Sequence, residues 1–374
     1  MKNKILIIGQ FPPPFHGSNV MAKLMVSILK KEEYQIIFID KSFSKSIETI
    51  GKPSLRKVLR IPILAIEIII ACLFKRPEIS IYFLACGKSA LLIDSFLLTL
   101  VRFHRIPYIL RFGGKGYYKL KNENFIWRFL VGYILSNAIG GIVLGETMKW
   151  DVNSFIPDEK LVCVPNAIEN RSFPFHLPPK KSIVQVLFLS NLHPKKGPLD
   201  VLKAANIIVQ QNKNVRFILA GANSSLNFTK QLKLYIVDKG LDKYVTMPGA
   251  VFGEEKDKLF MTSDIFVFPT YFEREIFGTV NIEAMSWGLP VISSTEGAIP
   301  EIVQDGVTGF IVNPKSPKEI ADKIMTLVNN PELRKKMGMK GREVFISKYT
   351  LNTYARNLDS AISFFMDINR RVKS

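Results

Sequence analysis

The chain has 374 residues, 47% of them hydrophobic, which is enough to bury two separate cores. Its 51 Lys and Arg residues outnumber its 32 Asp and Glu residues, and the net charge of +19 favours anionic partners such as phosphate-rich ligands, nucleic acid or an anionic membrane. The three cysteines, Cys72, Cys86 and Cys163, are too few and too irregularly spaced for a disulfide framework or a zinc site. We therefore expect the protein to lie in a reducing cytoplasm.

The first apolar run, at residues 5–8, follows two lysines and soon meets Gly9 and Pro12. It is too short for the apolar region of a signal peptide, and we interpret it as a first β-strand. The longest apolar stretch, residues 61–74, is interrupted by Pro62 and Glu67 and is shorter than the roughly 20 residues that a spanning helix needs. The sequence therefore predicts no transmembrane segment.

Short apolar runs alternate with helical segments along the whole chain. In the first half they occupy residues 5–8, 36–39, 79–84, 108–110, 142–144 and 161–164. After Pro178, Pro179, Lys180 and Lys181, which we interpret as a linker, they occupy residues 184–189, 217–220, 245–247, 265–268, 291–293 and 310–312. The pattern predicts an α/β protein with two doubly wound domains, at residues 1–178 and 179–350.

The last segment, residues 351–374, carries apolar side chains at helical spacing. These are Tyr354, Leu358, Ile362, Phe365 and Ile368. The spacing predicts a C-terminal helix and leaves open whether this helix closes the second domain or packs on the first.

The apolar run at residues 265–268 and a helical run at residues 280–287 predict a strand, a loop and a helix. In a parallel α/β sheet such a loop lies at the carboxyl end of a strand, where ligands bind. Gly278 allows a ligand to approach the backbone closely, and Thr279 is a candidate N-cap. The N–H groups of the first helical turn form an anion site, so we expect a phosphate group here.

Two glutamates, Glu275 and Glu283, flank this helix start. Carboxylates on either side of a bound phosphate can accept hydrogen bonds from hydroxyls, and hydroxyls beside a phosphate describe a sugar nucleotide. The alternative is structural: Glu283 favours the helix dipole, and Glu275 is a solvated loop charge.

Two further segments follow predicted strands and open helices. Lys196, near the end of residues 190–197, is placed to neutralise a diphosphate as a point charge, although exposed lysines before helices are common. Gly17 lies in a Pro-rich loop after the first strand and leaves space for a diphosphate at the start of a helix that runs to about Lys30. A lone Pro-rich turn is usually only a turn, so the position after the first strand carries this prediction.

Motifs extend on both sides of the Glu275 to Gly288 segment. They are Pro-Val-Ile-Ser-Ser at residues 290–294, Pro-Glu-Ile-Val at 300–303, Asp-Gly-x-Thr-Gly-Phe at 305–310 and Val-Pro-Asn-Ala-Ile-Glu at 164–169. Together they resemble the retaining GT-B glycosyltransferases of family 4, or glycosyl transferases group 1, which include bacterial surface-polysaccharide and lipopolysaccharide enzymes. The resemblance covers residues 160–350 well and the first 160 residues loosely.

The resemblance implies the GT-B fold, in which two Rossmann-like domains face each other across a cleft. It implies that the first domain holds the acceptor side and that the second domain holds the nucleotide sugar. It also implies that the helix at residues 351–374 crosses back to the first domain.

Roles for individual residues follow from the same resemblance. Glu275 and Lys196 are the implied catalytic residues, with Glu275 on hydroxyls of the transferred sugar and Lys196 on the departing diphosphate. Glu283 is implied to accept hydrogen bonds from the ribose hydroxyls. The implied donor-binding residues are Gly17, Asn191, Lys196, Phe277, Gly278, Thr279, Val280 and Glu283.

Two positions depart from the family pattern. Asn191 stands where relatives usually carry an arginine, so either Lys195 or another cation compensates for the missing charge, or the leaving group is held less tightly. Phe112 or Arg111 stands beside a Gly-Gly pair where many relatives carry a histidine that contacts the transferred sugar. The candidates on the acceptor or sugar side are His16, Arg111 and Lys115.

We expect a retaining, metal-independent glycosyltransferase that needs no cofactor. Its donor would be a nucleotide sugar, which we expect to be a UDP-sugar, and its acceptor a lipid-linked or polysaccharide glycan. The segment KPSLRKVLR at residues 52–60 can lie on an anionic membrane surface, so we expect a peripheral position on the cytoplasmic side of the cell membrane. The alternative for this segment is a surface helix with solvated charges.

Other functions stay open at this stage. The chain could be a GT-B nucleotide-sugar epimerase or hydrolase, or a catalytically inactive relative that acts as a membrane partner. Nucleic-acid binding is disfavoured because the basic residues are spread over both halves without Arg-aromatic clusters. The glycine spacing at residues 113–116 does not fit a dinucleotide-binding fingerprint.

Overall fold

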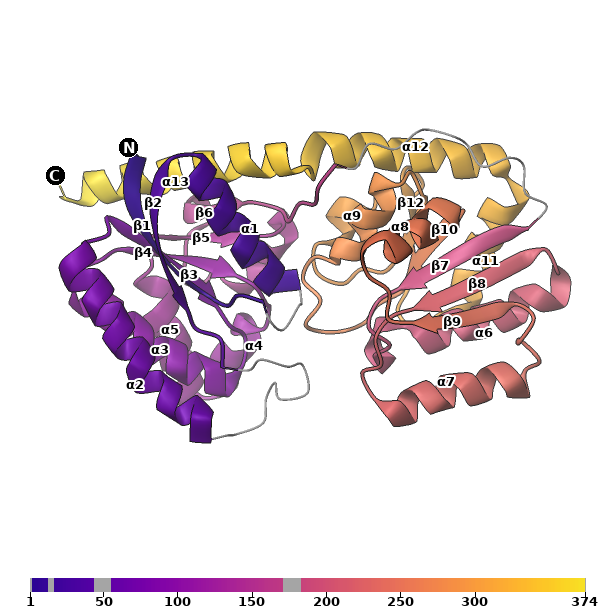
Figure 1. Cartoon of the computed structure of the whole chain (residues 1–374), viewed down its shortest axis with the longest axis horizontal. Coiled ribbons are helices and arrows are strands. Elements are labelled where there is room, and N and C mark those ends of the chain that lie inside the picture. Colours follow the sequence, from indigo (N-terminus) through magenta and orange to yellow (C-terminus); the bar gives the residue numbers. More distant parts are fainter. Residues whose placement is uncertain (1, 13–16, 44–54, 171–182, 374) are drawn as a thin grey trace. The chain divides into compact units, whose positions relative to one another are not determined.

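A computed structural model describes residues 2–12, 17–43, 55–170 and 183–373 (Figure 1). The chain forms two compact units: unit 1 is Met1–Asn166 with Tyr354–Ser374, and unit 2 is Ala167–Thr353. The division therefore falls between Asn166 and Ala167. The predicted linker at Pro178 to Lys181, and with it the predicted boundary at 178/179, lies outside the described residues.

The core of unit 1 is a six-stranded parallel sheet with the strand order β2-β1-β3-β4-β5-β6. Its strands are β1 Lys2–Gly9, β2 Tyr34–Asp40, β3 Ile79–Leu84, β4 Tyr108–Phe112, β5 Gly140–Val143 and β6 Leu161–Cys163. The strand order reverses between β1 and β3, so the loops after these two strands flank the switch point where ligands of open α/β sheets bind.

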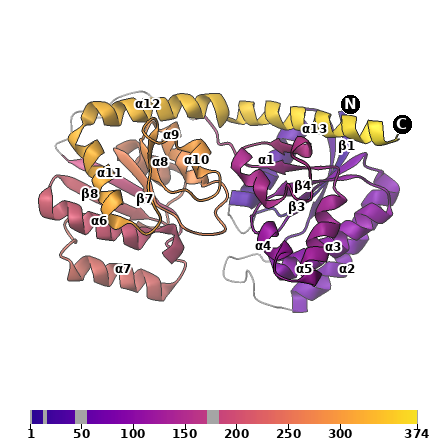
Figure 2. The same ribbon diagram turned by 180° about the vertical axis from the view of Figure 1, so that it is seen from behind.

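Helices cover both faces of this sheet. They are α1 Gly17–Lys31, α2 Leu55–Ile70, which continues into the π-helix η2 Ala71–Lys75, α3 Lys88–Phe103, α4 Tyr117–Lys121 and α5 Phe125–Ser136, with the 3-10 helices η3 Glu146–Asp151 and η4 Asp158–Lys160. In unit 1, α2, α3 and α5 lie side by side as one layer, as both views show (Figures 1 and 2).

The last helix, α13 Leu351–Lys373, packs on unit 1. Four of its five predicted apolar positions are buried, and only Ile368 is partly exposed. The Tyr34 hydroxyl donates to Asp359 Oδ1 at 2.8 Å, so α13 is also tied to β2. Phe365 fills the space over Gly140, where a Cβ would lie 2.3 Å from Phe365 Cε1.

A buried ion pair joins β2, β3 and α3 in unit 1. Lys41 Nζ lies 2.6 Å from Asp94 Oδ1, and both side chains are 3% exposed. Asp94 also accepts hydrogen bonds from the Tyr82 hydroxyl at 2.6 Å and from the Ala85 N–H at 3.0 Å. Burial lowers the pKa of Lys41, and the attraction of Asp94 offsets part of that effect.

Unit 2 contains a second six-stranded parallel sheet, with the order β12-β11-β10-β7-β8-β9. Its strands are β7 Val184–Leu189, β8 Val215–Ala220, β9 Val245–Gly249, β10 Ile265–Phe268, β11 Val291–Ser293 and β12 Gly309–Ile311. Its helices are η5 Pro194–Lys196, α6 Pro198–Gln211, α7 Leu226–Asp238, α8 Gly253–Thr262, α9 Thr279–Ser286, α10 Ile299–Ile302, α11 Pro317–Asn329 and α12 Pro331–Lys348. The strand order reverses between β7 and β10, which defines the switch point of this unit.

Candidate functional site

The loops after β7 and β10 meet at the switch point of unit 2. The Tyr271 N–H donates to the Lys195 carbonyl at 2.8 Å, which fastens one loop to the other. Gly197 has a φ of 86°, and a Cβ there would lie 2.6 Å from the Pro269 carbonyl oxygen. Only glycine fits this left-handed and close position, so the short helix η5 is held directly against the loop that follows β10.

Lys196 and Glu275 form an ion pair across these two loops. Their side chains are 18% and 13% exposed, so water screens the pair less than it screens a surface pair. Lys196 Nζ lies 5.0 Å from the centre of the Phe272 ring, and Glu275 Oε1 accepts from the Gly278 N–H at 3.1 Å. The structure thus brings the two predicted catalytic residues into contact beside the start of α9.

The start of α9 differs from the prediction in one respect. Gly278, with a φ of 67° and a ψ of 58°, is the N-cap residue, and Thr279 is the first residue of the helix. The prediction that Thr279 caps the helix is therefore wrong. The left-handed turn at Gly278 starts the helix without a side-chain cap, and the Glu275 carboxylate receives the N–H group at the turn.

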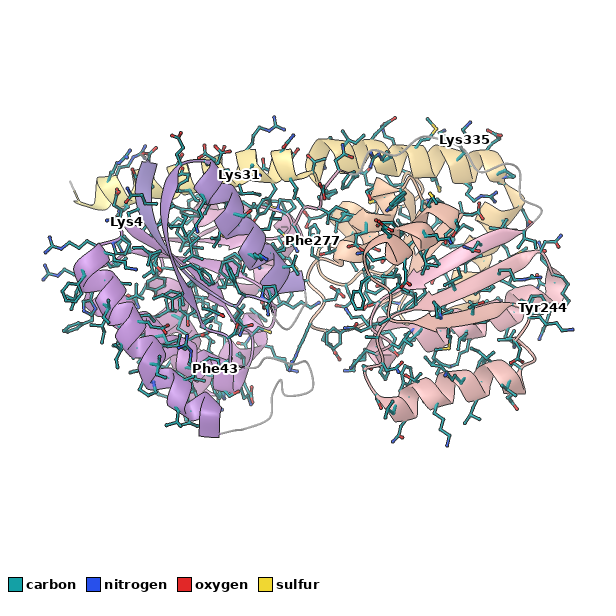
Figure 3. The ribbon with its side chains drawn as sticks, viewed as in Figure 1. Lys4, Lys31, Phe43, Tyr244, Phe277 and Lys335 are labelled. Atoms are coloured by element: carbon teal, nitrogen blue, oxygen red, sulfur yellow. The ribbon has the colours of Figure 1, made fainter. Side chains whose placement is uncertain are left out.

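Two residues near this helix start face inward. The Phe277 side chain, labelled in Figure 3, is 2% exposed and packs edge to face on Tyr349 with ring centres 5.9 Å apart. Its contribution to a ligand site is therefore limited to its backbone. Asn281 is fully buried, and neither atom of its side-chain amide has a hydrogen-bond partner among the described residues. Buried amides are normally satisfied, so the Asn281 amide is an unusual feature of the first turn of α9, and sequence reasoning missed it.

Glu283 lies in the second turn of α9 and forms an ion pair with Lys256 of α8, with Nζ and Oε1 2.8 Å apart. The two side chains are 18% and 26% exposed. Sequence reasoning missed Lys256, because a lysine 27 residues before a glutamate gives no local signal. The packing of α8 and α9 brings the two residues together.

The region around Asn191 carries little compensating charge. The Asn191 side chain is exposed, and the main-chain carbonyl oxygen of Asn191 accepts from the His193 N–H at 2.7 Å. Lys195, one of the cations predicted to compensate, forms an ion pair with Glu273 at 2.5 Å, and its side chain is 44% exposed. Lys196 is therefore the shielded cation of this loop.

In unit 1, the predicted residues occupy different environments. Gly17 begins α1, and His16 lies outside the described residues. Arg111 is 2% exposed at the end of β4 and donates from Nη2 to Asn166 Oδ1 at 2.9 Å, and its burial lowers the pKa of the guanidinium. Phe112 is also buried and packs against Tyr117.

The N–H groups at the end of the Gly-rich loop after β4 donate to another part of unit 1. The N–H groups of Gly116, Tyr117 and Tyr118 all donate to the Asp151 carboxylate, at 2.7, 3.2 and 3.0 Å. The partly exposed Lys115 lies in this loop, and its carbonyl oxygen accepts from the Cys86 thiol. Because an internal carboxylate takes these donors, the start of α4 is not open to a phosphate.

Residues 169–344, most of unit 2, match the family described as "Glycosyl transferases group 1". The spore coat protein SA of Bacillus subtilis is 30% identical over 179 residues, which cover 46% of this chain and 47% of that protein. The capsular polysaccharide biosynthesis glycosyltransferase CapM of Staphylococcus aureus is 30% identical over 175 residues, 46% of this chain and 43% of that protein. The chain thus spans about half the length of the curated relatives it matches.

The crystal structure of Anabaena HepE in complex with UDP superposes with a TM-score of 0.74, at 18% identity, over 96% of this chain and 99% of that chain. HepE was also crystallised with UDP-glucose. With two parallel six-stranded sheets, this likeness shows that the chain has the GT-B fold of two Rossmann-like domains. Unit 2 is the part whose sequence matches the group 1 glycosyl transferases.

Proposed function

We propose that the protein is a glycosyltransferase that takes a nucleotide sugar, specifically a UDP-sugar, and transfers the sugar to a lipid-linked or polysaccharide acceptor. The observation that carries this proposal is the shielded Lys196–Glu275 pair at the switch point of unit 2, beside the start of α9. Two comparisons support it: HepE binds UDP and UDP-glucose, and CapM is a glycosyltransferase of capsular polysaccharide biosynthesis.

Each site residue has one task in this proposal. Lys196 stabilises the charge that develops on the departing diphosphate, together with the N–H groups of Thr279 and Val280 in the first turn of α9. Glu275 accepts hydrogen bonds from hydroxyls of the transferred sugar, and Glu283 accepts from the ribose. Gly17 and Asn191 add contacts to the donor, as predicted from the sequence.

The reaction proceeds with retention of the anomeric configuration and without a metal ion. The bond from the anomeric carbon to the diphosphate oxygen breaks, and the acceptor oxygen forms the new bond on the same face. The leaving phosphate takes the proton of the acceptor hydroxyl, so no separate base is required. Lys196 and the helix start supply the positive field that the leaving group needs.

Donor binding requires an exchange of partners at the site. Glu275 holds Lys196, and Lys256 holds Glu283. A bound diphosphate draws Lys196 away from Glu275, which frees the Glu275 carboxylate for the sugar hydroxyls. The Lys196 pair thus keeps the Glu275 carboxylate in position before the donor arrives.

A thermal-shift panel tests the proposed donor class. UDP, UDP-glucose, GDP-mannose and ADP-glucose are compared at equal concentration, and we expect UDP and one UDP-sugar to give the largest rise in Tm. A ligand at 100 times its Kd stabilises the fold by about 2.7 kcal/mol. Stabilisation by none of the four would contradict the proposal. Release of free sugar or an epimer from the donor alone would instead indicate a hydrolase or an epimerase.

Replacing Glu283 should weaken donor binding more than turnover. In Glu283→Ala we expect the donor KM to rise about 10- to 100-fold, because a hydrogen bond to a charged group contributes about 1.5–3 kcal/mol. The kcat should stay nearly unchanged, because the ribose contact is equally strong in the ground state and in the transition state. Initial rates over a range of donor concentrations measure both constants. Lys256→Met is the matched control, because it removes the partner of Glu283 and keeps the carboxylate, so its KM should stay within about threefold of wild type. A pure kcat defect in Glu283→Ala would contradict the ribose role.

A further inference from the structure

The helix α2 is apolar on both its inner and its outer side. Leu64 and Ile68 are fully buried against unit 1. The opposite side carries Ile63, Ile66 and Ile70, which are 48%, 57% and 46% exposed. A helix that is apolar all round usually lies in the interior of a protein or in a membrane. In the part of the chain that the structure describes, no helix is both long and apolar enough to cross a bilayer.

The neighbouring helices extend this outer apolar surface. We define the apolar face as the exposed large apolar side chains of α2, η2, α3 and α5. They are Val58, Leu59, Ile63, Ile66, Ile70, Leu73, Phe74, Leu92, Phe96, Phe103, Phe125, Ile126 and Phe129. Because these helices form one layer of unit 1 (Figure 2), their outer sides share one face. Exposed apolar patches of this extent mark interaction surfaces.

Two exposed phenylalanines mark one end of the apolar face. Phe74, at the end of η2, is 78% exposed, and Phe103, at the end of α3, is 82% exposed. In a parallel sheet these two helix ends lie at the same edge, where β3 and β4 begin. Phe74 precedes Lys75 and Arg76, whereas Arg102 and Arg105 flank Phe103, and all four basic residues are exposed.

The region around the apolar face is strongly basic. Residues 55–136 contain 13 Lys and Arg residues and four Asp and Glu residues. Three of these four acids are already engaged: Glu67 pairs with Arg60, Glu123 pairs with Lys88, and Asp94 is buried with Lys41. The carboxylate of the fourth, Glu78, accepts a hydrogen bond from the Lys4 N–H at 3.2 Å. The apolar face is thus combined with a positive charge that has few opposing carboxylates.

We propose that the apolar face docks on the surface of an anionic lipid bilayer. Phe74 and Phe103 insert among the acyl chains, and the four basic residues beside them contact the lipid phosphates. Aromatic side chains flanked by Lys and Arg suit this interface because the ring enters the apolar layer while the charge stays at the headgroups. A second copy of this chain would bring the same positive charge to the contact, so the charge favours lipid over self-association.

Only the purpose of the docking, which is to hold the enzyme at a lipid-linked acceptor, rests on the proposed function. The docking itself is independent of catalysis. Binding to vesicles and binding to UDP are therefore separate measurements, and each can fail without the other.

Vesicle co-sedimentation of the full chain tests the docking. We expect binding to vesicles of phosphatidylcholine with 30% phosphatidylglycerol (about a third anionic lipid), much weaker binding to phosphatidylcholine alone, and loss of binding as salt rises. Phe74→Ser/Phe103→Ser should lower the partition coefficient at least about tenfold. Lys75→Gln/Arg76→Gln should lower it about 25-fold, because each basic residue near the surface contributes about fivefold.

Matched variants in unit 2 control for changes in exposure and charge. Leu226 and Val237 of α7 are 79% and 65% exposed, so Leu226→Ser/Val237→Ser removes a similar apolar surface. Lys335→Gln/Lys336→Gln removes an exposed basic pair on α12. Both control variants should bind vesicles as wild type does, and the Tm of every variant, with and without UDP, verifies its fold.

Three results would overturn the docking. They are no binding of the wild type to anionic vesicles, equal losses in the unit 1 and unit 2 variants, or a lipid-indifferent dimer that Phe74→Ser/Phe103→Ser converts to a monomer. The last result would make a second copy the occupant of the apolar face.

Discussion

Replacing Lys196 by alanine should lower kcat by about 10²- to 10³-fold, equivalent to about 2.7–4 kcal/mol in the activation barrier, which is the usual cost of losing one preorganised donor to a developing negative charge. Lys196 suits this role because its side chain is 18% exposed and its ammonium lies over the Phe272 ring and is held by Glu275. In such a shielded position a charge acts more strongly on the leaving group than a charge in water.

Lys195→Ala is the control for Lys196→Ala. It removes the adjacent lysine, which is 44% exposed and pairs with Glu273, and exposed pairs of this kind contribute about 0–1 kcal/mol. We expect its kcat to remain within about threefold of wild type. Both variants are compared at saturating donor, and Tm values verify that Glu275 tolerates the loss of its partner. An unchanged kcat in Lys196→Ala would remove the role assigned to Lys196.

Replacing Asp94 by alanine should destabilise unit 1 by about 3–5 kcal/mol, because it leaves the buried Lys41 ammonium without its counter-ion. Tyr82 and the Ala85 N–H lose their acceptor in the same variant. In Lys41→Met, by contrast, Asp94 keeps these two donors, so the loss should be clearly smaller.

Urea unfolding measures the loss of stability of these variants in unit 1 alone when the fluorescence of unit 2 is removed. Trp127 and Trp150 belong to unit 1, and Trp287 belongs to unit 2. In a Trp287→Phe background the tryptophan fluorescence therefore reports unit 1 alone, which avoids treating the two units as a single transition. Equal losses in Asp94→Ala and Lys41→Met would contradict the assignment of the cost to an unpaired ammonium.

The same variant predicts a pH dependence. Burial lowers the pKa of Lys41 below its ordinary value, and the loss of Asp94 removes the attraction that opposes this shift. A lysine whose pKa is lower in the folded state than in the unfolded state destabilises the fold while it stays protonated. The deficit of Asp94→Ala should therefore shrink as the pH rises from the folded pKa of Lys41 towards the ordinary pKa of lysine.

The fold follows from the sequence to a large extent. Each of the twelve predicted apolar runs overlaps a strand, and the prediction of an α/β fold with two doubly wound sheets is confirmed. Strands of a parallel sheet are buried on both faces and read as continuous apolar runs, such as Ile79–Leu84, in which all six residues are buried. The limits of β3, β7, β10 and β11 match the predicted runs, and those of the other strands shift by up to three residues because hydrogen bonding, and not hydropathy, decides where a strand ends.

The candidate site was predictable only where strand ends determine it. Lys196 and Glu275 meet because β7 and β10 are neighbours in the sheet, and loops at their carboxyl ends share one edge. The contact of Lys256 with Glu283 depends on how α8 packs beside α9. The contact of Asp151 with the start of α4 joins residues 35 positions apart in the chain. Such contacts depend on tertiary packing, which local patterns do not encode. The predicted N-cap of α9 was wrong because a left-handed glycine, and not a residue with a capping side chain, starts this helix.

The position of α13 has a consequence for the order of folding. Unit 1 is built from two pieces of chain, and the second piece, Tyr354–Ser374, is synthesised after all of unit 2. Until it emerges from the ribosome, the space that Phe365 fills over Gly140 is open and the sheet lacks one of the helices that cover it. Unit 2 has all its residues earlier, so we expect it to reach its native state first, in reverse of the usual order in which N-terminal domains fold before C-terminal ones.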